Sequence, residues 1–162
     1  MNSDIFGDLE KWAKVLDILD RLEKSRKLDE HQTGLARILK DGQHWRLLEK
    51  ALECGKEITE PQNELVSEVF NVVTDRSIYL DARILAVNSL SSLVRRINRT
   101  NNHKITRTLI IRKMRNILDL PEPPIFREAI AKSLQAMIGK NEELDTELKA
   151  AVKKEANRSS VD

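Results

Sequence analysis

Five basic residues that lie close together in the chain are the first candidates for binding chemistry. Three end one apolar-periodic stretch and two open the next, with TNNH between the two groups: Arg95, Arg96, Arg99, Lys104 and Arg107. Guanidinium and ammonium groups gathered at one edge bind phosphates or carboxylates. The sequence has no Asp or Glu from Ala82 through Leu118, so this basic edge predicts a site for a polyanion or an acidic partner.

The same cations also have a structural explanation. Basic residues at the end of a helix gain about 0.3 to 1 kcal/mol each from the helix dipole, which would account for the first three. Lys104 and Arg107 instead open a helix, where the dipole disfavours them. The net charge of the whole chain is +2, which argues neither for nor against a polyanionic partner. The basic edge is therefore either a binding site or a solvated surface.

Residues suited to catalysis or metal binding are sparse. His31, His44 and His103 are scattered, and none is followed at the third or fourth position by another His, Cys or Asp, so no metal site is predicted. Cys54 has no nearby histidine to activate it and is expected to serve packing. The chain also lacks a glycine-rich phosphate loop. We therefore expect no enzyme and no cofactor.

The tryptophans Trp12 and Trp45 lie on apolar stripes and are expected in the core, with Trp45, near a helix start, as an alternative surface anchor.

The elements that carry these residues are expected to be helices throughout. Apolar residues recur at spacings of three and four, charged residues make up 33% and aromatic residues 4% of the chain. This pattern predicts an all-α protein of about eight helices, and a length of 162 residues suits one domain. Gly42 and Gly55 are expected to stop their helices, Gly55 in the left-handed conformation. The expected helices cover about 4–25, 27–42, 43–55, 61–75, 81–99, 103–120, 123–140 and 141–156.

Two of the expected helix pairs repeat each other. A shift of 44 residues aligns Leu65 with Leu109 and Arg83 with Arg127, together with most of the apolar positions around them. The predicted domain, 1–156, then consists of clear repeats at 61–99 and 105–139, a degenerate pair at 28–55, and capping helices at 4–25 and 141–156. Residues 157–162 are expected to form a flexible tail.

Each clear repeat places an arginine inside an apolar helix face. Arg83 projects near the centre of its face, and Arg127 has the same relation to its own. An unpaired charge there would cost several kcal/mol, so a carboxylate is expected close by. Asp75 and Asp119, each eight residues earlier, predict the structural ion pairs Asp75–Arg83 and Asp119–Arg127, and a guanidinium can also bond carbonyls of the turn.

In each clear repeat a turn aspartate, Asp75 or Asp119, is followed by an arginine early in the second helix, Arg83 or Arg127. These arginines begin the segments RILAVNSL and REAIAKSL, and the pattern resembles the HEAT repeat. The resemblance implies antiparallel helix pairs stacked into a right-handed α-α superhelix, with an armadillo-like arrangement as the alternative. Repeat families of this kind specify a binding surface and no particular ligand.

These observations predict a non-enzymatic scaffold that binds another protein. The alternative is sequence-independent binding of a DNA or RNA backbone through the basic edge. A DNA glycosylase comes third, because some HEAT-like proteins act on alkylated purines. A single cysteine and the absence of a signal peptide or long apolar run predict a cytoplasmic protein without membrane contact. Pairing of exposed stack ends into a homodimer is left open.

Overall fold

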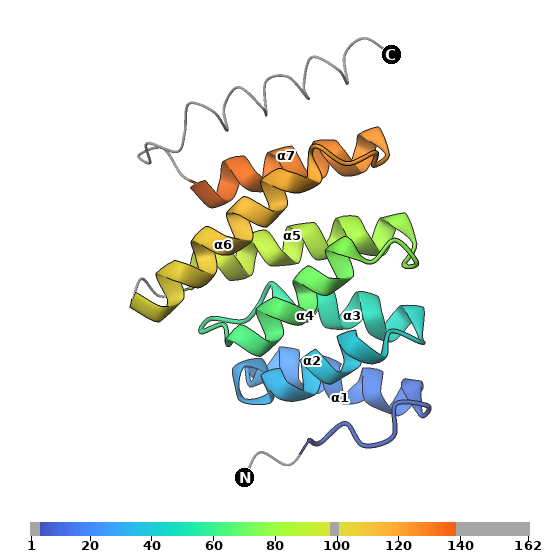
Figure 1. Cartoon of the computed structure of the whole chain (residues 1–162). Helices are drawn as coiled ribbons and strands as arrows, with labels where there is room; N and C mark the ends of the chain where they lie inside the picture. Colours follow the sequence, from blue (N-terminus) through green and yellow to red (C-terminus); the bar gives the residue numbers. More distant parts are fainter. Residues whose placement is uncertain (1–3, 98–100, 139–162) are drawn as a thin grey trace. The chain divides into compact units, whose positions relative to one another are not determined.

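The structure is a computed structural model that describes residues 4–97 and 101–138, the side chains of the second range from Arg107 onward. Every regular element in these ranges is helical, which confirms the all-α prediction for the described part of the chain. The predicted helix 141–156 and the tail 157–162 lie outside it. The elements are α1 (Trp12–Ser25), the 3-10 helix η1 (Leu28–His31), α2 (Gln32–Asp41), α3 (Trp45–Gly55), α4 (Asn63–Thr74), α5 (Leu80–Arg96), α6 (Asn101–Ile117) and α7 (Pro124–Ile138) (Figure 1).

The chain divides into two compact units, with the boundary between Arg96 and Ile97. Unit 1 contains α1 to α5, and unit 2 contains α6 and α7. The prediction of a single domain over 1–156 stays a prediction.

The helices of unit 1 form two rows, with α1, α3 and α5 in one and α2 and α4 in the other. Helix α3 packs against both α1 and α5, while α2 packs on α3 and α4, and α4 packs on α5. Figure 1 shows α1, α3 and α5 starting at the same side of unit 1. The apolar stripes meet between the rows, where the side chains of Leu19, Leu35, Leu52, Leu65 and Leu90 are fully buried.

Unit 2 consists, in its described part, of α6 packed on α7. Its buried residues follow the predicted apolar stripes and include Met114, Phe126, Ile130 and Leu134.

The first helix begins later than the sequence pattern suggests. Helix α1 starts at Trp12, so the predicted capping helix 4–25 is wrong over its first eight residues. The Asp8 carboxylate accepts a hydrogen bond from the Glu10 N–H at 3.0 Å, and the Asp8 carbonyl accepts one from the Lys11 N–H at 3.2 Å. These local bonds form a turn in competition with the helix.

The two predicted helix-stop glycines behave differently. Gly42 directly follows α2, as expected of a helix stop, and its φ is 58°. Gly55 is the last residue of α3 and does not have a positive φ, so the expectation of a left-handed stop is wrong there. A Cβ at Gly55 would overlap the Ser89 hydroxyl on α5. Gly55 therefore serves the close approach of α3 and α5.

The connection between α3 and α4 is tied to the start of α2. The Asp29 carboxylate accepts hydrogen bonds from the Thr59 N–H at 2.9 Å, the Thr59 hydroxyl at 2.7 Å and the Glu60 N–H at 2.8 Å. The buried Gln32 amide donates to the Glu60 carbonyl and accepts from the Gln62 N–H. Partial burial of Asp29 opposes its ionisation, but these hydrogen bonds outweigh burial and lower its pKa.

Candidate functional site

Arg83 lies inside the core of unit 1, with 5% of its surface exposed. Its Nε donates to the carbonyl oxygen of Val73, the next-to-last residue of α4, at 3.1 Å. The Asp75 carboxylate accepts instead from the N–H and the hydroxyl of Ser77, at 2.9 and 2.6 Å. These bonds, with a weaker attraction from Arg83, lower the pKa of Asp75. The structure thus gives Arg83 a carbonyl contact at the end of α4, and the ion pair of Arg83 with Asp75 stays a prediction.

Arg127 makes the corresponding contact in unit 2. Its guanidinium is half-buried and donates to the carbonyl oxygens of Leu118 and Leu120. Asp119 lies between these two residues in the chain and is exposed. Both arginines therefore bind carbonyls at or just after the end of the first helix of their pair, as the sequence analysis allows for a guanidinium. The ion pair of Arg127 with Asp119 stays a prediction.

Two residues of the predicted basic edge also bind backbone carbonyls within their own unit. Arg96 donates to the carbonyl oxygens of Lys56 and Ile58, the second at 2.8 Å. Arg107 donates to the carbonyl oxygen of Met137 near the end of α7. A guanidinium bound in this way stabilises a helix end, and less of it is available to a ligand.

The rest of the basic edge is described in part. Arg95 is exposed at the end of α5 in unit 1. Arg99 lies outside the described residues, and so does the side chain of Lys104. Convergence of the five cations on one edge stays a prediction.

A second group of surface residues, separate from the basic edge, lies around the start of α3. Trp45 is 53% exposed, so the expectation that it lies in the core is wrong, and its alternative placement as a surface residue is confirmed. The Arg46 guanidinium carbon lies 5.1 Å from the centroid of the Trp45 ring and 5.6 Å from that of Trp12. Trp12 is stacked on His44 with the ring centroids 4.3 Å apart. These contacts join the starts of α1 and α3.

Tyr79 extends this surface to the start of α5. It directly precedes that helix and is 41% exposed. The carboxylate of Glu49, which stands one turn after Trp45 on the same face of α3, acts on the Tyr79 hydroxyl and helps to raise its pKa. The resulting aromatic cluster, which spans the starts of α1, α3 and α5 at one side of unit 1 (Figure 1), consists of Trp12, His44, Trp45, Arg46 and Tyr79.

The residue types of the aromatic cluster favour contact with a protein. Trp, Tyr and Arg are the side chains that most often dominate binding energy at protein interfaces. A cation-π contact at an exposed site contributes about 0.5 to 1 kcal/mol, so the two contacts of Arg46 help to hold the indole rings in place. A rigid aromatic surface loses little conformational entropy on binding.

No family model, curated protein or solved structure matches the chain. Membership of the HEAT family therefore stays a prediction, and the function has to be argued from the chain's own residues.

In the described part of the chain, the remaining reactive groups do not form a second site. Cys54 is fully buried, and burial together with the neighbouring Glu23 raises its pKa to about 12, which keeps it a thiol. Within residues 4–97 and 107–138, no three His, Cys, Asp or Glu side chains gather in a way that would hold a metal ion. None of the described helices combines the length and the apolar character needed to cross a membrane.

The Trp and Tyr residues of the aromatic cluster follow a regular spacing in the sequence that an analysis of helix periodicity does not detect. Trp12, Trp45 and Tyr79 stand at positions 12, 45 and 79, which are 33 and then 34 residues apart. Each opens or directly precedes a helix of the same row. A search for residue types that recur at helix starts would have found them together.

The Tyr79 contact gives a direct titration experiment, because the chain has a single tyrosine. Burial and the hydrogen bond to Glu49 raise the pKa of Tyr79 to about 12. Glu49→Gln removes the negative charge, so we expect phenolate absorbance near 295 nm to develop at lower pH, toward the ordinary value of about 10. Far-UV circular dichroism recorded at each pH shows whether the chain is still folded. Identical titration curves for the two proteins below the pH of unfolding would contradict the contact.

Proposed function

We propose that the chain is a non-enzymatic helical-repeat scaffold of the HEAT-like, right-handed superhelical type that binds another protein through the aromatic cluster. The observation that carries the proposal is Trp45: a large indole, 53% exposed, placed on the first residue of a helix and braced by Arg46. Single exposed apolar residues are common on protein surfaces, but a cluster of aromatic residues from three helices indicates an interaction site. The single cysteine supports the expectation of a cytoplasmic setting.

The charge around the aromatic cluster favours a protein over a phosphate backbone. Residues 1–96 contain 15 Lys and Arg against 17 Asp and Glu, so unit 1 has no excess of positive charge. Glu49 and Asp81 both act on Tyr79 with negative charge. A polyanion would be repelled there, whereas an apolar protein segment would bury the indole without such a penalty.

The test compares Trp45→Ala with a matched control, Ile125→Ala, which removes an apolar side chain that is 58% exposed on unit 2. Affinity-tagged wild type and both variants are used to capture proteins from the native lysate, and each captured protein is quantified by mass spectrometry. A residue that dominates binding is worth about 2 kcal/mol or more, which corresponds to about a thirtyfold loss. We expect one protein to be recovered by wild type and Ile125→Ala and lost with Trp45→Ala. Equal recovery with Trp45→Ala would contradict the proposal.

The alternative of DNA or RNA backbone binding makes a different prediction. It requires fluorescence anisotropy of random duplex or single-stranded DNA to show binding that falls steeply with salt and is abolished by charge reversal of Arg95, Arg99 and Lys104. The proposal made here expects no such binding at low salt.

A further inference from the structure

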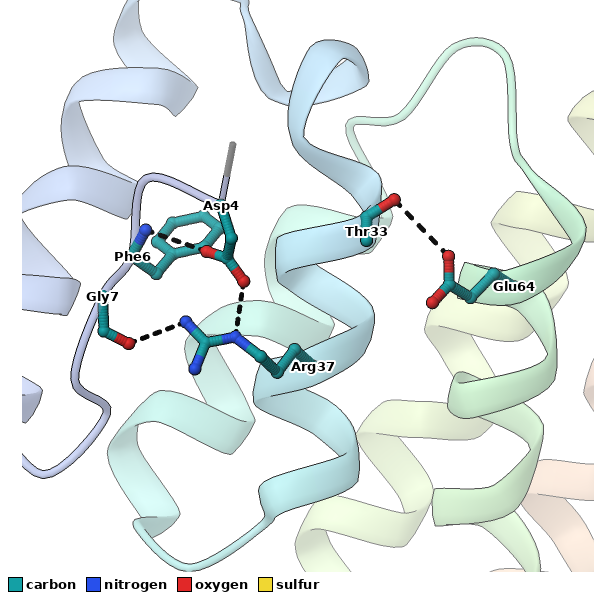
Figure 2. Close-up of polar contacts among 6 residues, drawn as sticks. All are labelled: Asp4, Phe6, Gly7, Thr33, Arg37 and Glu64. Carbon is teal, nitrogen blue, oxygen red and sulfur yellow. Dashed lines mark hydrogen bonds and ion pairs between the residues drawn. The ribbon is translucent and has the colours of Figure 1, made fainter. Parts of the chain in front are cut away.

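The segment from Asp4 to Gly7 lies along α2, on the side of that helix opposite to α4 (Figure 2). On the α4 side, the Thr33 hydroxyl of α2 donates to the Glu64 carboxylate at 3.4 Å. The segment thus covers part of the flank of α2 that faces away from α4 (Figure 2). Helical stacks of this kind need their end faces covered.

The centre of this contact is a ring placed over a glycine. Phe6 is 3% exposed although it lies outside any helix. A Cβ at Gly34 on α2 would overlap the Phe6 ring, so the missing side chain creates the notch that the ring fills. The ring also meets the edge of His31, with the centroids 6.5 Å apart.

Arg37, almost one turn after Gly34, supplies the polar half of the contact. Its Nε forms an ion pair with the Asp4 carboxylate, and its Nη2 donates to the Gly7 carbonyl at 2.8 Å. The Asp4 carboxylate also accepts from the Phe6 N–H at 2.9 Å, which fixes the shape of the segment (Figure 2). One guanidinium therefore binds both the Asp4 carboxylate and the Gly7 carbonyl, on residues that precede and follow Phe6.

These contacts resemble the anchoring of a short peptide more than the packing of a helix. Among the described residues, the segment's hydrogen bonds to α2 run through the Arg37 side chain, and this ion pair is partly exposed, with 42% and 26% of the two side chains accessible. Short segments held by a few anchors open at low free-energy cost. A segment of the same chemistry could then take the same place.

We propose that the notch at Gly34, together with Arg37, is a recognition site for Asp-X-Phe-Gly segments, occupied in this structure by the chain's own residues 4–7 and open to the same segment from a second copy of the chain. The ring fills the notch, and the carboxylate and the carbonyl pair with Arg37. Exchange of the segment between two copies would join them without a change in the site.

The test uses the full-length chain and a fluorescent peptide of residues 2–9, NSDIFGDL. Phe6→Ala empties the notch, and the double variant Phe6→Ala/Gly34→Ala fills it again with a methyl group at a helical position where alanine is favoured. Because the tethered segment competes at an effective concentration of about 1 mM, we expect wild type to bind the peptide at least about tenfold more weakly than Phe6→Ala. The double variant, and a peptide with alanine in place of its phenylalanine, should show no binding.

A second variant, at the surface, keeps the test decisive if Phe6→Ala does not fold. Asp4→Lys reverses one charge of the exposed ion pair and releases the segment while the notch stays intact, so it should also bind the peptide more tightly than wild type. Circular dichroism identifies the variants that keep their helices. Absence of peptide binding to folded Asp4→Lys or Phe6→Ala at about 1 mM, or equal binding by Phe6→Ala and the double variant, would overturn the proposal.

Discussion

Replacement of Arg83 by methionine is expected to lower the free energy of unfolding of unit 1 by about 3 kcal/mol. Methionine retains much of the aliphatic packing but leaves the Val73 carbonyl without the donor that Arg83 provides. A buried acceptor left unpaired costs about 1 to 3 kcal/mol, and the space left by the guanidinium, which is 5% exposed, adds a cavity term. Urea unfolding followed by far-UV circular dichroism measures the loss as a shift of the midpoint.

Asp75→Asn is the matched control for this prediction. If Asp75 were the direct partner of Arg83, its loss would strand a buried charge at a cost of about 3 to 5 kcal/mol. Because the exposed Asp75 carboxylate bonds Ser77, we expect a loss below about 1 kcal/mol. Equal destabilisation by the two variants would contradict the carbonyl as the principal partner of Arg83.

Gly55→Ala is expected to destabilise unit 1 by about 2 kcal/mol, although alanine favours a helix by about 0.5 to 1 kcal/mol over glycine. The reason is the overlap of the new methyl group with the Ser89 hydroxyl where α3 approaches α5. Thermal or urea unfolding of the two proteins under the same conditions measures the difference.

Ser89→Ala should relieve that overlap. Ser89 is fully buried, and its hydroxyl has no hydrogen-bond partner among the described residues. The single Ser89→Ala variant is therefore expected to lie within about 1 kcal/mol of wild type, and the double variant should recover most of the stability, with a coupling energy of about 1 to 3 kcal/mol. If the double variant shows simply the sum of the changes in unfolding free energy caused by Gly55→Ala and Ser89→Ala, this contact is excluded as the cause of the destabilisation.

The helices and the burial of Arg83 could be predicted because both follow from local spacing. Apolar residues around Arg83 recur at three and four positions, which places the arginine on the buried face whatever its partner is. The contact of Arg83 with the Val73 carbonyl could not be predicted in the same way. Ser77 stands two residues from Asp75 and takes its carboxylate, while any turn offers carbonyls that leave no mark in the sequence.

The sequence predictions that were wrong, at the start of α1 and at Gly55, concern residues whose local pattern is overridden by another interaction. Ile5, Phe6 and Leu9 continue the apolar spacing of α1, but the Asp8 turn prevents the helix from starting there. Gly55 resembles a helix stop, whereas its role depends on the approach of Ser89 from a helix 34 residues later in the chain. Contacts of that separation cannot be read from periodicity.

The aromatic cluster was missed for the opposite reason. Trp45 fits the apolar stripe of α3, and spacing alone cannot show that its position at the helix start leaves it at the surface. The contact of Trp45 with Arg46 and the interaction of Glu49 with Tyr79 arise where the starts of the helices lie at one side of unit 1.

Photo-crosslinking from the aromatic cluster tests the proposed function most directly. A benzophenone amino acid is placed at Trp45, at Tyr79 or, as a control, at the exposed Ile125, and each full-length protein is irradiated in the native lysate. The account predicts adducts to one and the same protein from positions 45 and 79, and none to that protein from position 125. Equal adducts from all three positions, or none from position 45, would contradict binding through this surface.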